Sequence, residues 1–469
     1  QDEALPESGY KEYFSAGADV CGTNTLGATS YEESRAAAQL AKAAAAEATR
    51  GDAERPRFVA GVIGPTAHAL SSPGSGCTWD ELVGLYTGQI RGLVDGGVDL
   101  LAVEMVSDTL NAKAAIFAVD EHFEQAGRQR PPLLISAAAA ADGRTPSGQS
   151  IEAFCISVKH ARPLSVGITG GLGSGQARRL CKALAELNLG WCHACAGAGG
   201  EGAEACAAVA TELASERLVN FVGTCGASPA HVAAMVAKVQ GAAPRPLPAL
   251  PGRPALQLAG LEAHHVRPDG GCQLVGQRCN MTGSARFKGL VDAYKYTRGA
   301  AGWEAALELC AEQCARGADL LDLNFDSELL DAKWAMGKFV RLCGATPEVA
   351  KVPLVLSSAS WPVIEEGLRS AQGRCVVNAL SLAQGEEEFL RLGKACLRYG
   401  AAVVVMTAGA AEECPSFQER VQIGTRAYSL LRMKLDFPAE DIILDCSVRP
   451  VGSGASAKDF IDAMAELKR

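Results

Sequence analysis

The sequence lacks the features of a membrane protein and of a nucleic-acid-binding protein. No apolar run reaches membrane-spanning length, and the first residues, QDEALPESGYKEYF, are acidic and polar, so we expect neither a transmembrane segment nor a signal or transit peptide. The net charge is −9 over 469 residues, with no basic patch that a phosphate backbone would require. Nucleic acid is therefore not an expected partner.

The sequence also lacks a disulfide framework. Its seventeen cysteines are odd in number and are spread along the chain without regular spacing. This pattern is typical of free thiols, so we expect a reducing compartment, the cytoplasm first, with an organelle left open.

The composition and patterning predict two α/β domains. The chain is 48% apolar and 21% charged, and it is longer than one ordinary domain needs. Apolar strand-like runs alternate with amphipathic helical stretches throughout, which is typical of a parallel α/β architecture. The expected strands are residues 18–22, 57–64, 100–104, 133–137, 165–169, 190–194 and 218–223, followed by 271–276, 320–323, 353–358, 375–379, 401–407 and 442–445. Helices are expected over 30–50, 78–94 (opened by a Thr78–Glu81 capping box), 108–125 and 150–160.

The two halves are separated by a proline-rich segment, and each repeats one helix–strand corner. Residues 241–254 hold five prolines, which keep a chain extended, so we predict domains at 1–240 and 259–469 joined by a linker or strap at 241–258. The corner recurs as GADV, GVDLLAVE, GADLLDLN and YGAAVVVM, where glycine after a helix is expected to take the left-handed conformation.

The stretch NFVGTCGASPAHVAAM, residues 220–235, is the first candidate site. It predicts a short strand, a glycine-rich turn carrying Cys225, and a helix that Ser228 caps and Pro229 opens. A thiol at the carboxyl end of a parallel strand lies where α/β barrels place their chemistry. The alternative reading of Cys225 is a small buried cysteine.

Several phrases in order along the chain resemble cobalamin-dependent methionine synthase. They are GTNTLGATSYEE, RFVAGVIGPT, GVDLLAVEMVSDTLNAKAAIFAVDE, SGQSIEAF and HVAAM in the first half, then NMTGSARFKGL, GADLLDLNFDSELLDAKWAM, VPLVLSSASWPVIEEGL and VVNALSLAQGEEEF. The resemblance implies two (β/α)8 TIM-type barrels in tandem, a homocysteine-binding module and a pterin-binding module for methyltetrahydrofolate. Both barrels look truncated, since the first strand of the first and the last strands of the second are missing.

The resemblance implies a zinc site that this sequence retains only in part. The family activates homocysteine on zinc held by three cysteine thiolates, one in a GLNCxLG phrase and two in GGCCGT. Here the phrases read GITGGLG, with Gly170 in place of the cysteine, and GTCGAS, with Cys225 alone. A relocated site using Cys225, His193 and either Cys192 or Cys195 has acceptable ligand types and remains the alternative.

The implied ligand pockets are altered in the same way. In the amino-acid pocket Thr23, Asn24, Thr25 and Glu104 remain, whereas Gly22 and Ala67 replace a glutamate and an amide. In the pterin pocket the retained polar candidates are Asn280, Asp322, Asn324, Asp326, Asn378 and Asp445. The positions that lost the family residue there are Ser357, Ser360, Gly409 and Ser447. Loss of pterin-reading carboxylates leaves polar ring atoms unpaired, which should abolish tight folate binding.

Three functions follow as hypotheses. The first is a non-catalytic double barrel that binds no cofactor and serves as a structural subunit with protein partners, favoured by the kept scaffold and the high Ala and Gly content. The second is an active 5-methyltetrahydrofolate–homocysteine methyltransferase with relocated zinc. The third is a pterin- or amino-acid-binding sensor without turnover.

Overall fold

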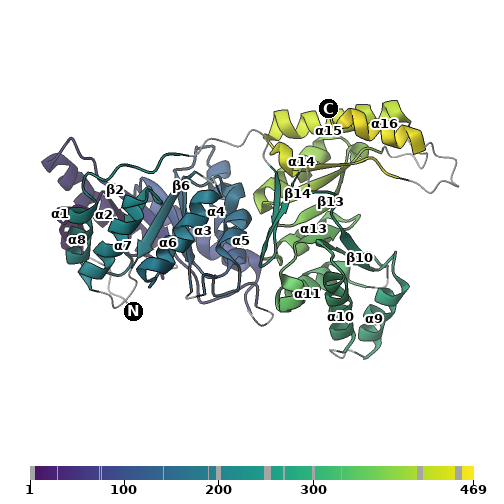
Figure 1. The fold of residues 1–469 in the computed structure, drawn as a ribbon, viewed down its shortest axis with the longest axis horizontal. Coiled ribbons are helices and arrows are strands. Elements are labelled where there is room, and N and C mark those ends of the chain that lie inside the picture. Colours follow the sequence, from purple (N-terminus) through teal and green to yellow (C-terminus); the bar gives the residue numbers. More distant parts are fainter. Residues whose placement is uncertain are drawn as a thin grey trace. The chain divides into compact units, whose positions relative to one another are not determined.

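The protein, described as a computed structural model, divides into two compact units, Gln1–Gly252 and Arg253–Arg469. The structure describes residues 6–28, 30–72, 74, 76–140, 142–187, 190–196, 202–247, 255–267, 270–297, 301–328, 330–408, 416–448 and 457–469. Figure 1 shows both units, coloured along the sequence.

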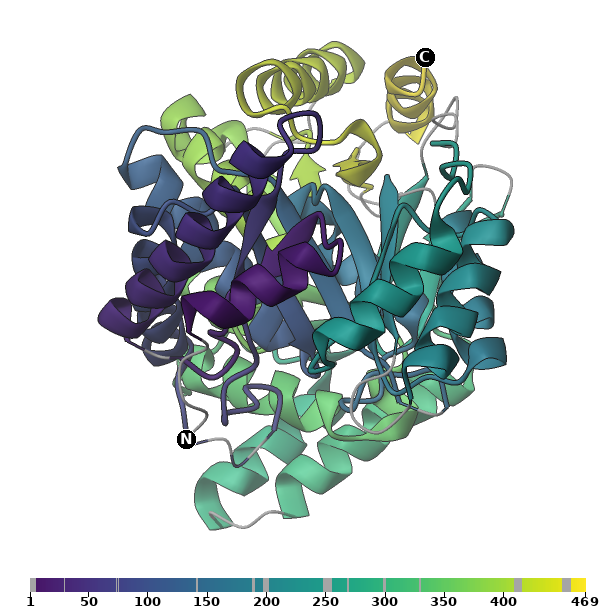
Figure 2. The same cartoon turned by 90° about the vertical axis from the view of Figure 1, so that its left-hand side faces the viewer.

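The first unit is an open barrel of seven parallel strands surrounded by helices (Figure 2). The sheet order is β1-β2-β3-β4-β5-β6-β7, so each strand pairs with its neighbours in the chain. In chain order the elements are α1 (Glu7–Ser15), β1 (Val20–Gly22), α2 (Tyr31–Gly51), β2 (Phe58–Ile63), α3 (Trp79–Asp95), β3 (Leu100–Val106), α4 (Thr109–Gln125), β4 (Leu133–Ala138), α5 (Ile151–Val158), η1 (Lys159–Ala161), β5 (Ser165–Gly170), α6 (Ser174–Glu186), β6 (Trp191–Ala196), α7 (Ala203–Ser215), β7 (Phe221–Gly223) and α8 (Pro229–Val239).

The ring of helices closes where the sheet does not. Within the described residues β1 and β7 each pair with one strand only. The first and last helices of the unit nevertheless touch, because Tyr13 Oη donates to Ala227 O at 2.6 Å and a Cβ on Gly17 would lie 3.1 Å from Val236 Cγ1. The first unit is therefore an incomplete (β/α)8-type barrel.

Small residues let α2 and α3 approach closely. Ala38 and Ala41 on α2 are fully buried, and a Cβ on Gly92 of α3 would lie 2.3 Å from Tyr31 O. A Cβ on Gly96 would lie 2.4 Å from Ala38 Cβ. Much of the alanine and glycine in this part of the chain is therefore used in packing within the unit, and its abundance is no argument for a partner.

The repeated helix–strand corner has the predicted geometry. Gly17, Gly97, Gly317 and Gly400 have φ angles of +103°, +86°, +90° and +74°. Only glycine takes this left-handed conformation without steric cost, so the corner phrase is confirmed as a helix stop in both units.

The second unit is a six-stranded parallel sheet with helices and a separate hairpin. The sheet order is β10-β11-β12-β13-β14-β15, and β8 pairs with β9 antiparallel. The elements are β8 (Leu256–Ala259), β9 (Ala263–Val266), β10 (Val275–Asn280), α9 (Ala285–Thr297), α10 (Ala301–Ala315), β11 (Leu320–Asn324), α11 (Ala332–Gly344), α12 (Pro347–Ala350), β12 (Leu354–Ser357), α13 (Trp361–Leu368), β13 (Val376–Ser381), η2 (Leu382–Gln384), α14 (Glu386–Tyr399), β14 (Ala402–Met406), α15 (Phe417–Leu435), η3 (Ala439–Asp441), β15 (Ile442–Asp445) and α16 (Ala457–Leu467). Within the described residues this unit is a second, incomplete TIM-like barrel, as predicted.

Two expectations need correction, and several elements of the structure were not predicted. The strand predicted at 271–276 is wrong, because the strand β10 runs over Val275–Asn280 and its polar residues Gln277 and Arg278 hid it from an apolar pattern. The hairpin β8–β9 and helix α1 were not foreseen. Ser228 precedes α8 but makes no capping bond to the backbone, since its hydroxyl pairs with His231 Nδ1 at 2.9 Å instead.

Part of the proline-rich segment packs on the first unit. Arg245 is buried, and its guanidinium donates to Gly190 O at 2.9 Å and to Ala185 O at 3.2 Å. Residues 248–254 of the predicted linker lie outside the described part of the chain. Among the described residues, no helix combines the length and apolar composition that a membrane crossing requires.

Candidate functional site

Strand alternation brings a polar set to the mouth of the first barrel. Thr169 on β5 is in register with Cys195 on β6, and Cys195 with Gly223 on β7, so their side-chain positions share the inner face. Thr169 donates to Ser136 Oγ on β4 at 2.9 Å. These residues lie at the carboxyl ends of their strands, where parallel barrels carry ligands.

Glu104 and Met105 complete this set from β3. The pairing of β3 with β4 shifts between Val103 and Val106, and Met105 has a φ of +55°, a left-handed value that is uncommon for a methionine. Met105 Sδ lies 3.9 Å from Cys225 Sγ. Desolvation raises the pKa of Glu104 to about 7.

Both thiols at this mouth have raised pKa values. Burial raises the pKa of Cys225, and the nearby Glu104 carboxylate raises it further. For Cys195 burial is again the main cause, with additional contributions from Glu104 and Cys225. At neutral pH both are therefore protonated thiols and poor nucleophiles.

The other proposed substitute ligands lie elsewhere. Cys192 points to the outer face of β6, where it interacts with Cys155 on α5 and Cys181 on α6. His193 points inward, but its Nδ1 is hydrogen-bonded to Ser165 Oγ at 2.8 Å, and burial lowers its pKa to about 4. The structure therefore brings Cys195 near Cys225 and separates Cys192 from both.

The threonines of the predicted amino-acid pocket hold the loop after β1 against β2. Thr23 and Thr25 are buried, with their hydroxyls 2.6 Å apart. Val62 N donates to Thr23 Oγ1 at 2.9 Å, and Thr25 Oγ1 donates to Val62 O at 2.6 Å. Asn24 N donates to Tyr10 Oη at 2.9 Å. These bonds give the loop a structural role whether or not a ligand binds.

In the second unit, Asp322, Ser357 and Asn378 form one hydrogen-bonded row across β11, β12 and β13. Ser357 Oγ donates to Asp322 Oδ1 and accepts from Asn378 Nδ2 at 3.0 Å. Burial raises the pKa of Asp322, and the hydrogen bond from Ser357 opposes that shift. Ser357, which stands where the resemblance expects an aspartate, thus occupies an acceptor atom of Asp322.

Asp326 and Asn324, two further pterin-pocket candidates, are hydrogen-bonded within the second unit. Asp326 accepts from Ser358 Oγ and, at 2.9 Å, from Ala359 N. Asn324 Oδ1 accepts from Asp326 N at 3.0 Å.

Two further candidates fold the turns that follow their strands. Asn280 Oδ1 accepts from Thr282 N at 2.9 Å and from Gly283 N at 2.8 Å. Asp445 Oδ1 accepts from Ser447 N at 2.7 Å, and Ser447 has a left-handed φ of +51°. Gly409 lies outside the described residues.

Sequence reasoning missed Ser136, Thr169, Met105 and Ser358. The first two could have been found, because Ser136 lies one residue before the end of the predicted strand 133–137 and Thr169 is the last residue of the predicted strand 165–169. Met105 and Ser358 gave no such signal, since a bulge and a strand-to-helix turn position them.

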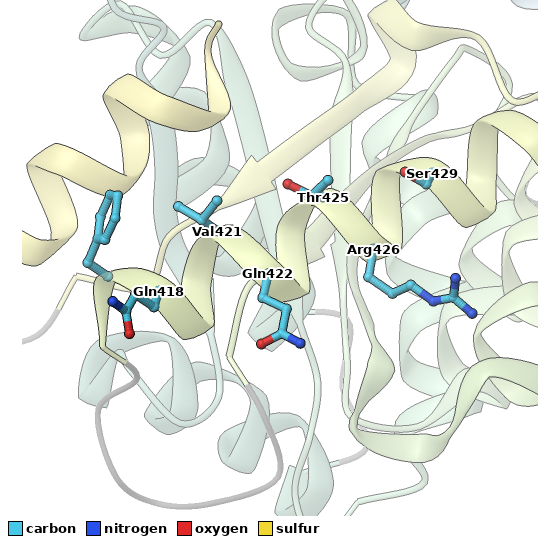
Figure 3. Close-up of a pocket in the computed structure, with 7 residues that line it drawn as sticks. Gln418, Val421, Gln422, Thr425, Arg426 and Ser429 are labelled. Atoms are coloured by element: carbon cyan, nitrogen blue, oxygen red, sulfur yellow. The ribbon is translucent and has the colours of Figure 1, made fainter.

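An open depression lies along a helix of the second unit. It measures about 520 Å³ and is lined by one face of α15 (Figure 3). Its lining residues are Phe417, Gln418, Val421, Gln422, Thr425, Arg426 and Ser429. None of these residues belongs to a site predicted from the sequence.

Family models match each of the two units described above. The family model described as homocysteine S-methyltransferase matches residues 4–239. The chain belongs to this family. The model described as pterin binding enzyme matches residues 276–469, so the two modules follow one another in a methionine-synthase-like architecture.

Solved structures of the homocysteine methyltransferase MmuM from Escherichia coli are also similar to this chain. The oxidized form is 18% identical, with a TM-score of 0.41, over 49% of this chain and 83% of that chain. The apo form is 18% identical, with a TM-score of 0.40, over 50% of this chain and 84% of that chain.

The donor set of this family member does not fit the zinc site that the resemblance implies. Gly170 offers no side-chain donor at the end of β5, and Cys225 is a single thiol beside Thr224 and Gly226. Within the described residues, no three Cys, His, Asp or Glu side chains converge closely enough to hold a metal ion. We therefore derive no chemical step through zinc.

Proposed function

We propose that this methionine-synthase-like chain is a pseudoenzyme, a double barrel that has lost zinc-dependent homocysteine activation and tight folate binding. The observation that carries the proposal is the donor set at the mouth of the first barrel. Three thiolates are needed to hold a catalytic zinc with an open position, and Cys225 is the only thiol at the positions of the family motif.

The hydrogen-bonded row of the second unit supports the same proposal. A pterin ring needs carboxylate and amide groups whose hydrogen-bonding atoms are available. Here Asp322 and Asn378 are bonded through Ser357, and Asp326 is bonded to the backbone before α13. A ligand would have to break these bonds, so its net gain would be small.

The role that remains for such a chain is structural. We propose that it acts as a subunit of a larger protein assembly in a reducing compartment, without a cofactor of its own. The retained scaffold of both units supports this role. Co-purification with partner proteins is expected from native extract, and recovery of the chain only as a free monomer would count against it.

The test is the zinc content of the purified chain by elemental analysis. We expect far less than one zinc per chain, unchanged in Cys225→Ser. A matched gain-of-ligand variant, Gly170→Cys with Thr224→Cys, adds a thiol at the end of β5 and a second thiol beside Cys225, and it should bind more zinc than the parent chain. Near one zinc per parent chain that is lost in Cys225→Ser would overturn the proposal.

Folate binding is tested separately by calorimetry with methyltetrahydrofolate. No saturable heat is expected at micromolar concentrations of the chain. Homocysteine-dependent demethylation of methylcobalamin by the parent chain would show that catalysis has been retained and would refute the pseudoenzyme reading.

A further inference from the structure

Four cysteines that belong to none of the sites described above gather in the second unit. Cys279 lies on β10, Cys310 and Cys314 lie one helical turn apart on α10, and Cys343 lies on α11. Cys279, Cys310 and Cys343 are buried, whereas Cys314 is half-buried. We refer to these four residues as the thiol cluster.

The closest contact in the thiol cluster joins Cys279 and Cys310. Their Sγ atoms lie 3.2 Å apart, compared with about 2.05 Å in a disulfide. Gln313 holds Cys279 in place, because its Nε2 donates to Cys279 Sγ at 3.4 Å while its Oε1 accepts from Arg278 N at 2.8 Å. Cys310 also contacts Cys343.

We propose that Cys279 and Cys310 are a modification site that a peroxide converts into an intramolecular disulfide. One thiolate attacks the peroxide O–O bond and becomes a sulfenic acid, with release of water or an alcohol. The second thiol then attacks the sulfenic sulfur, so the S–S bond forms and a second molecule of water leaves. The two sulfurs are oxidised and the peroxide is reduced.

The strand that carries Cys279 lies at an edge of the described sheet, where a small oxidant can reach it through local opening. Within the described residues β10 pairs only with β11, and Val275, Gln277 and Arg278 are exposed. Edge strands with few buried side chains open locally at lower free energy than central strands. The reaction is expected to be slow and to accelerate with pH, because contact with Cys310 and burial raise the pKa of Cys279.

The position of the pair gives the modification a structural consequence. The disulfide would join the strand β10 to the helix α10 directly below Asn280, which folds the turn after β10. Local opening of the sheet edge at β10 would then require β10 and α10 to move together.

Peptide mapping tests the proposal on the full chain. The protein is treated with hydrogen peroxide at pH 8, its free thiols are alkylated in denaturant, and trypsin then separates peptides 279–286, 299–316 and 342–351. We expect a cross-link between 279–286 and 299–316 that lacks two hydrogens and disappears on reduction. It should persist in Cys314→Ser and be lost in Cys310→Ser.

Two other cysteines serve as internal controls. Cys272 is exposed and should be oxidised at the same dose, whereas Cys396 is fully buried and should stay reduced. Absence of the cross-link once Cys272 has reacted would overturn the proposal, as would a cross-link that persists in Cys310→Ser or joins Cys310 to Cys343. If Cys396 is oxidised together with formation of the cross-link, the reaction is due to unfolding of the chain. That result would also overturn the proposal.

Discussion

The strongest stability prediction concerns the buried ion pair of Arg374 and Asp441 in the second unit. Their side chains are 3% and 1% exposed. Arg374 Nη1 donates to Asp441 Oδ1 at 2.9 Å, and Nη2 donates to Asp441 Oδ2. The same guanidinium donates to Gly400 O at 2.9 Å and to Gln257 O at 2.7 Å, so it joins the hairpin, the end of α14 and the segment before β15.

Arg374→Met removes the cation and all four bonds while keeping most of the side-chain volume. It leaves the Asp441 carboxylate buried without its counter-ion, which typically costs about 3–5 kcal/mol. Asp441→Leu should cost a similar amount, because it isolates the guanidinium. The double variant should be less destabilised than the sum of the two, since it buries no unpaired charge.

Urea unfolding of the full chain, followed by circular dichroism, measures these differences in the transition of the second unit. The matched control is Arg426→Met, which breaks an equally bidentate pair with Glu386 whose side chains are 56% and 50% exposed, and which should cost less than about 1 kcal/mol. The reasoning would be refuted if Arg374→Met cost no more than Arg426→Met, or if the two buried substitutions were additive.

Three smaller predictions follow from single contacts. The pKa of Glu104 is about 7 in the folded chain, above its ordinary value of 4.5, so the folded chain holds this proton more tightly than the unfolded chain. The free energy of unfolding should therefore fall by about 3 kcal/mol as the pH rises from below 4.5 to above 7. Glu104→Gln should flatten this part of the stability–pH profile, and a profile that the substitution leaves unchanged would contradict the prediction. Thr78→Ala removes the capping box of α3 and should cost about 1 kcal/mol in the first-unit transition; the control Thr87→Ala, in the middle of the same helix, should cost less. Gly167→Ala places a Cβ 2.3 Å from His193 Cδ2 inside the first barrel and should cost about 1–3 kcal/mol by thermal unfolding. The control Gly175→Ala, in the first turn of α6 with open space around it, should not destabilise the chain.

The strands of the first unit were predictable because a strand that is buried on both faces consists of consecutive apolar residues. Residues 57–64 and 165–169 coincide with β2 and β5 to within a residue or two. β10 was misplaced because it is an edge strand, so Gln277 and Arg278 are exposed and no apolar run marks it. The hairpin β8–β9 was missed for a related reason, since His264 and His265 occupy a strand that is only half-buried.

The site was harder to predict than the fold because its residues come from different strands, and the face on which each residue lies depends on strand boundaries and bulges. The sequence places Cys192 and Cys195 together, yet β-strand alternation sends them to opposite faces of β6. Cys225 meets Met105 across the barrel mouth only because of the bulge in β3.

The hydrogen bonds of the polar residues in the second unit show why family residues that are present in the sequence are weak evidence that the family's ligand still binds. From the sequence, Asp322 and Asn378 are candidate pterin-binding groups. In the structure Ser357 lies between them and bonds to both, so the three side chains form one internal network. Once such a network is satisfied, Asp322 and Asn378 can be retained for the stability of the strand ends alone. Ser357→Asp should therefore not restore a pocket by itself, since it would place a second carboxylate against the buried Asp322 and raise the pKa of one of the two.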